Sequence, residues 1–71
     1  MKTYTLTIYD GRGHIKFRAD SLMLGRLKMY CLTHLKGKQT ADIIDCETGE
    51  VVYIVEARGN SCPKVTYSVA V

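Results

Sequence analysis

The sequence predicts a two-layer α+β domain with the element order strand-strand-helix-strand-strand-strand, in which one helix packs on one face of a mostly antiparallel sheet. Two turns carry this prediction, Asp10-Gly11-Arg12-Gly13 and Glu47-Thr48-Gly49-Glu50, because each lies between runs of alternating apolar and polar residues, as in β-hairpins. A stretch with helical apolar spacing separates them. Because one helix covers only one face of a sheet, we expect the other face to be open.

The first hairpin is predicted from the alternation of residues 2–9 and 14–19. Its apolar face consists of Tyr4, Leu6 and Ile8, followed after the turn by Ile15, Phe17 and Ala19. A two-residue turn pairs Leu6 with Ile15, whereas a four-residue loop pairs Ile8 with Ile15. The two registers differ by two residues, so both keep the apolar side chains on one face.

The helix is predicted from about Leu22 to Lys36, with Asp20 or Ser21 as its N-cap and Gly37 just past its end. Gly25 inside it costs about 1 kcal/mol relative to alanine. At 100° per residue, one side of this helix is mostly apolar. That side carries Met23, Leu24, Leu27, Tyr30, Cys31, His34 and Leu35.

The second hairpin is predicted around a type I turn closed by a glycine bulge at Gly49. Counting outward from this turn pairs Ile44 with Val52 and Asp42 with Ile54. Residues 51–55 are apolar in succession, a pattern that indicates a strand covered on both faces. Alternation resumes over residues 64–71, which predicts the last strand.

The whole chain, residues 1–71, is predicted to be a single small domain. The order of its elements is similar to that of the ubiquitin-like β-grasp, and a plain antiparallel sheet with the helix packed across it fits the same order. A domain of this size buries only about 60% of its unfolded surface, so a second copy or a partner would help to cover apolar area.

Composition narrows the classes of function. Hydrophobic residues make up 46% of the chain and charged residues 24%, which predicts a folded domain, and the net charge of +3 favours anionic partners weakly. The first residues lead directly into a strand pattern, and no apolar run approaches the ~20 residues of a membrane-spanning helix. We therefore expect a cytoplasmic protein that does not enter the membrane.

Candidate catalytic and metal-binding residues are few. Cys31, His34, Cys46 and Cys62 would have to supply a zinc site from separate elements, whereas structural zinc sites usually take paired ligands from tight loops. Cys31 lies on the apolar side of the helix, where cysteine packs as a small hydrophobe. Cys62 lies in a polar loop with no identifiable base. We expect no enzymatic activity, no metal and no cofactor.

Two surfaces are candidates for binding. Ile44, Val52 and Ile54 are predicted to form an apolar patch on the open sheet face that contacts a protein partner or a second copy. His14, Lys16 and Arg18 are predicted to project from one face of the second strand as a basic stripe. The favoured interpretation is a small intracellular protein-interaction or adaptor domain that acts through its open face and self-associates. The alternative is weak nucleic-acid binding by the stripe.

Overall fold

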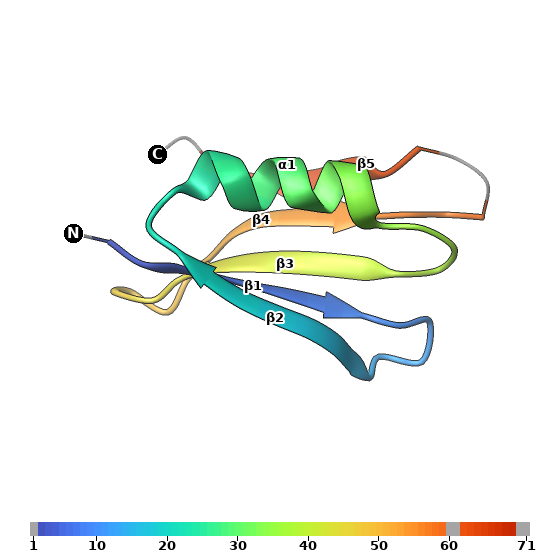
Figure 1. Cartoon of the computed structure of the whole chain (residues 1–71), viewed down its shortest axis with the longest axis horizontal. Coiled ribbons are helices and arrows are strands. Elements are labelled where there is room, and N and C mark those ends of the chain that lie inside the picture. Colours follow the sequence, from blue (N-terminus) through green and yellow to red (C-terminus); the bar gives the residue numbers. More distant parts are fainter. Residues whose placement is uncertain (1, 60–61, 70–71) are drawn as a thin grey trace.

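The computed structural model describes residues 2–59 and 62–69. Its elements are β1 (Tyr4–Tyr9), β2 (Ile15–Ser21), α1 (Leu24–His34), β3 (Thr40–Asp45), β4 (Val51–Glu56) and β5 (Lys64–Ser68). The strands form one sheet in the order β2-β1-β3-β4-β5, and every pairing is antiparallel (Figure 1). The predicted two-layer α+β fold is confirmed in its plain antiparallel form, since the described strands include no parallel pair of the β-grasp type.

The path of the chain explains the position of the helix. β1 lies between β2 and β3 and is antiparallel to both, so β2 and β3 run in the same direction. Strands that run in the same direction need a crossover connection, and α1 supplies it (Figure 1). Within the described residues, no helix is long and apolar enough to cross a membrane.

The core lies between α1 and the three inner strands. Leu6 of β1 is opposite Ile43 of β3, which in turn is opposite Tyr53 of β4. The helix contributes Leu27 and Cys31 to this core, and Leu35, the residue just after it, adds a third buried side chain. These three belong to the predicted apolar side of the helix, so this part of its assignment is confirmed. At one margin of the core, Phe17 of β2 stacks on Tyr30 of α1 with 5.1 Å between ring centroids.

The first hairpin adopts neither predicted register, because Ile8 is opposite Phe17. The Asp10 carboxylate accepts hydrogen bonds from the backbone N–H groups of Arg12 (2.8 Å) and His14 (2.9 Å), which closes a longer loop over residues 10–14. A β-bulge then leaves Lys16 without a partner residue. The main register still differs from the predicted ones by an even number of residues, so Phe17 remains on the face of Ile8.

The helix is shorter than predicted and begins at Leu24. Neither predicted cap is used, because both residues belong to β2. The Asp20 carboxylate instead accepts a hydrogen bond from the Thr5 hydroxyl at 2.7 Å, and Ser21 Oγ accepts the backbone N–H of Met23 at 3.0 Å. The sheet pairing of these residues therefore overrides their capping preference.

The second hairpin confirms one predicted pair and overturns the other. Asp42 is opposite Ile54 as predicted, but Ile44 is opposite Val51. A bulge between these two pairs accommodates the extra residue, Val52, which is 4% exposed and belongs to the core. The prediction that Val52 lies in the open-face patch is therefore wrong, because a bulge places two successive residues opposite one and breaks the strict alternation.

Candidate functional site on the open sheet face

The face of the sheet opposite α1 is the candidate site, and we call it the open face. The strand register arranges its side chains in rows that cross the sheet. The central row consists of Arg18, Thr7, Asp42, Ile54 and Tyr67, from β2 to β5. The next row consists of Asp20, Thr5, Ile44 and Val51, from β2 to β4. The polar residues thus lie mostly over β1, β2 and β3, and the apolar residues toward β4 and β5.

The polar half of the open face contains buried polar side chains. Thr5 and Thr7 are buried although no helix covers them. One carboxylate oxygen of Asp42, Oδ1, is buried without a hydrogen-bond partner among the described residues. Burial raises the pKa of Asp42, and the Tyr9 hydroxyl and the Arg18 guanidinium partly offset this increase. The Thr5 hydroxyl already donates to Asp20 at 2.7 Å, whereas Asp42 Oδ1 has no partner in the described part of the chain but is buried below the surface.

The apolar half has unoccupied surface. Ile44, Val51 and Ile54 are half-buried, and Tyr67 is 46% exposed. A shallow hollow is lined by Val51, Ile54 and Tyr67 together with Glu50. Two of the three predicted patch residues, Ile44 and Ile54, therefore lie on the open face, and Val51 takes the position expected of Val52. We define the apolar patch as Ile44, Val51, Ile54 and Tyr67.

Sequence reasoning missed Val51 and Tyr67 for different reasons. The valines at 51 and 52 are identical in chemistry, so no local signal shows which of them faces the core. Tyr67 is opposite Ile54 only because β5 pairs with β4, and a bulge at Thr66 puts Val65 opposite Val55. The even spacing of Val65 and Tyr67 had suggested that they share a face.

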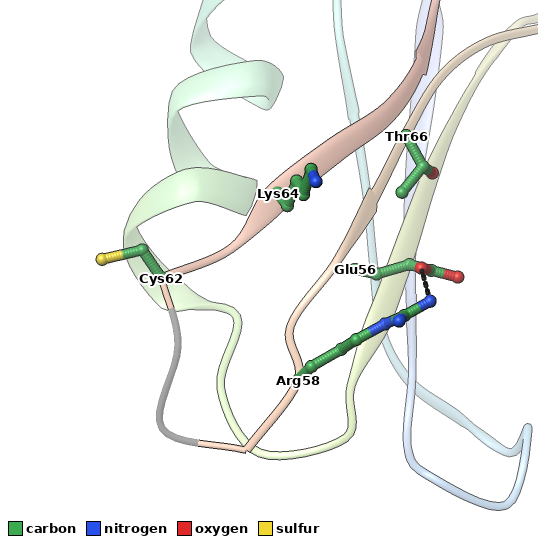
Figure 2. A pocket seen from close by; sticks show the side chains of 5 residues that line it. All are labelled: Glu56, Arg58, Cys62, Lys64 and Thr66. Atoms are coloured by element: carbon green, nitrogen blue, oxygen red, sulfur yellow. Dashed lines mark hydrogen bonds and ion pairs between the residues drawn. The ribbon is translucent and has the colours of Figure 1, made fainter.

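A second hollow, of about 250 Å³, lies where β4 and β5 lead into their connecting loop (Figure 2). It is lined by Glu56, Arg58, Cys62, Lys64 and Thr66. The Arg58 guanidinium donates to Glu56 at 3.3 Å, and Lys64 is opposite Glu56 across the strand pair. In Figure 2 the Cys62 sulfur points away from the other labelled side chains. The hollow therefore offers cations and a hydroxyl, with one carboxylate that is already paired.

The predicted basic stripe is exposed but does not form a regular row. His14 precedes β2, and its Nδ1 lies 3.8 Å from the Asp10 carboxylate. Lys16 is the bulged residue, and Arg18 lies opposite Thr7 in the central row of the open face. Because a bulge interrupts the alternation, the equal spacing that the sequence suggested for His14, Lys16 and Arg18 is not maintained along the strand.

The three cysteines lie in different environments. Cys31 is buried, and burial raises the pKa of its thiol to about 11, so it is protonated and unreactive at neutral pH. Cys46 and Cys62 are exposed. In the part of the chain that the structure describes, no three His, Cys, Asp or Glu side chains are grouped so as to hold a metal ion.

Comparison of the chain with protein-family models, with curated proteins and with solved structures finds no match. The chemistry of the open face is therefore the basis on which a function can be argued.

Proposed function

We propose that this chain is a small protein-interaction domain that binds a second copy of itself through its open face. The observation that supports this is the apolar patch of Ile44, Val51, Ile54 and Tyr67, which lies on the sheet face that α1 leaves uncovered. An apolar centre with a polar margin is the usual composition of a protein interface. Association would remove this patch from water, which a domain of this size cannot do with its own elements.

The charges around the patch favour a second copy as the partner. Acidic Asp20 and Glu50 lie toward one end of the open face, and basic Arg58 and Lys64 lie toward the other. Two copies stacked face to face, with a twofold axis that lies in the interface and runs across the strands, would place the acidic end of each over the basic end of the other. A self-complementary surface of this kind is what a symmetric dimer requires.

Ile54→Lys is the variant that tests this proposal, because Ile54 lines the apolar hollow and is only half-buried in the monomer. We expect the wild-type chain to dimerise in a concentration series followed by light scattering after size exclusion. We expect Ile54→Lys to weaken the dimer by about thirtyfold, as for loss of a central contact worth about 2 kcal/mol. Circular dichroism should show an unchanged fold. Val52→Lys is unsuitable because Val52 belongs to the core.

The matched control is Met29→Lys, which introduces the same charge on α1, where Met29 is 64% exposed. This variant should dimerise like the wild type. The proposal fails if the wild-type chain is monomeric at every concentration. It also fails if Met29→Lys and Ile54→Lys weaken association equally, since the effect would then come from net charge and not from the patch.

A further inference from the structure

Basic side chains gather at one end of the long axis of the molecule. The β1–β2 turn, the α1–β3 loop and the start of the β4–β5 loop all lie at this end (Figure 1). We call the cations of these segments and of the adjoining strand ends the basic end. It consists of Arg12, Lys16, Lys36, Lys38, Arg58 and Lys64. All six are exposed.

Contacts between the loops hold together the segments that carry these cations. The backbone N–H of Gly59 donates to Gly37 at 3.1 Å, which joins the α1–β3 loop to the end of β4. Lys38 packs closely against Gly11 of the β1–β2 turn, where an added Cβ would lie 3.1 Å from the Lys38 Cβ. Lys38 and Arg58 also line one hollow together. These contacts connect the β1–β2 turn, the α1–β3 loop and the start of the β4–β5 loop. Lys16 and Lys64 lie at the adjoining starts of β2 and β5.

The two acidic groups at this end already have hydrogen-bond or ion-pair partners. Two backbone N–H groups donate to the Asp10 carboxylate and hold its pKa below the usual range. Glu56 is paired with Arg58 at 3.3 Å. Among the described residues, Asp10 and Glu56 are the acidic side chains of this end, so five of its six cations remain without an ion pair. The opposite end, where β2 ends and β3 leads into β4, carries Asp20, Asp45, Glu47 and Glu50, and Lys2 pairs with Asp45 there.

We propose that the basic end binds the phosphate backbone of a nucleic acid without regard to base sequence. The molecule measures 22 Å by 16 Å across its long axis. The cations come from three loops and from the adjoining starts of β2 and β5 at this end. A single phosphate group cannot reach all of them, whereas duplex DNA presents one negative charge about every 1.7 Å. The spread of the cations therefore fits an extended polyanion better than a small phosphorylated ligand.

This site differs from the predicted basic stripe. It shares Arg58 and Lys64 with the charged margin of the proposed dimer interface, so a duplex and a second copy would compete for these two cations. Arg12, Lys16, Lys36 and Lys38 do not belong to that margin. Lys16 is common to the stripe and to the basic end. Arg18 lies in the central row of the open face, one strand away from Asp42 across Thr7, and His14 lies 3.8 Å from the Asp10 carboxylate. The additional cations come from loops that are distant in the sequence and adjacent only in the folded chain.

Fluorescence anisotropy with a labelled DNA duplex of random sequence tests the proposal. If five phosphates are neutralised, log affinity should fall against log salt with a slope of about −4.5. Lys38→Gln with Lys64→Gln should lower the affinity about tenfold in low salt and make the slope shallower by about 2. The control is Arg26→Gln with Lys28→Gln on α1, which has the same net charge and should change both quantities little.

Four results would overturn the proposal. The wild-type chain could fail to bind the duplex in low salt. The two double variants could lose affinity equally, which would indicate a diffuse effect of net charge. Polyglutamate could displace the duplex as well as unlabelled DNA does, which would indicate an acidic protein as the partner. Inorganic pyrophosphate could displace it equally well, which would indicate a compact phosphate site.

Discussion

Asp42 and Asp45 lie three residues apart on β3 and experience opposite electrostatic environments. Asp45 is 3% exposed, accepts the backbone N–H of Glu47 at 2.9 Å and pairs with Lys2 at 3.3 Å, and these contacts lower its pKa. Burial raises the pKa of Asp42, whose Oδ1 has no hydrogen-bond partner in the described residues. Ionised Asp45 therefore stabilises the fold, whereas ionised Asp42 destabilises it.

Asp42→Asn should raise the free energy of unfolding at pH 7, because it removes a charge whose burial is only partly compensated. A pKa that is higher in the folded state means that the ionised carboxylate costs stability above the folded pKa. This cost decreases as the pH falls below the folded pKa and is gone below the unfolded pKa, so the stability of the wild type should approach that of the variant in acid. Urea unfolding across a pH series would measure the difference.

Asp45→Asn is the control in the same pH series, because its stability should change in the opposite direction. A lowered pKa contributes stability above the unfolded value, and this contribution is lost as the pH falls through the folded pKa. Asp45→Asn should therefore be less stable than the wild type at pH 7, with a difference that vanishes in acid. If Asp42→Asn also destabilises at pH 7, the environment assigned to Asp42 is wrong.

At the scale of the elements, three β-bulges decide which side chains reach which face. They occur at Lys16, Val52 and Thr66. The bulge at Val52 buries that residue and leaves Val51 on the open face, and the bulge at Thr66 separates Val65 from Tyr67. Periodicity correctly predicts the strands and most of their faces, because alternation depends on local geometry. It does not locate bulges, because they depend on how two strands pair.

Gly25 lies inside α1 without a packing role among the described residues. No atom lies within 4 Å of the position that a Cβ would take there, so a methyl group would meet open space. Gly25→Ala should therefore stabilise the domain by about 0.5–1 kcal/mol, because alanine loses less backbone entropy in a helix. The midpoint of urea unfolding would measure this gain.

Gly49→Ala is the matched contrast, because Gly49 has a φ of 77° in the β3–β4 turn. Alanine in that left-handed conformation should cost about 1–2 kcal/mol. A loss of stability in Gly25→Ala would show that the α1 backbone approaches another group more closely than the structure describes.

At the scale of the whole molecule, the sheet order places β1, β3 and β4 inside and β2 and β5 at the edges. Both edge strands contain a bulge, and β2 also carries the charged residues Lys16, Arg18 and Asp20. Bulges and charges discourage edge-to-edge pairing with another chain. This is why the face of the sheet, and not its edges, is the surface that we propose for self-association.

Native-state hydrogen exchange should rank the strands by their place in the sheet. The amides of β1, β3 and β4 should exchange more slowly than those of the edge strands, because these three strands have a neighbour on both sides. β1 should be the most protected of them, because it is buried for most of its length. The amides of β5, whose residues are all exposed, should exchange fastest among the strands. Protection of β5 equal to that of β1 in dilute monomer would contradict the sheet order.

The sequence by itself determined the class of fold, the element order and the core-facing helix residues Leu27 and Cys31, because these follow from local periodicity and turn chemistry. Met23 and His34, predicted on the same side of the helix, are exposed. It also correctly placed Ile44 and Ile54 on the open face. Only the tertiary structure decided that Val52 belongs to the core and that Tyr67 joins the patch, since bulges and strand order arise from pairing across the sheet. It alone brought Lys38, Arg58 and Lys64 to one end, because the loops that carry them meet only after the chain has folded.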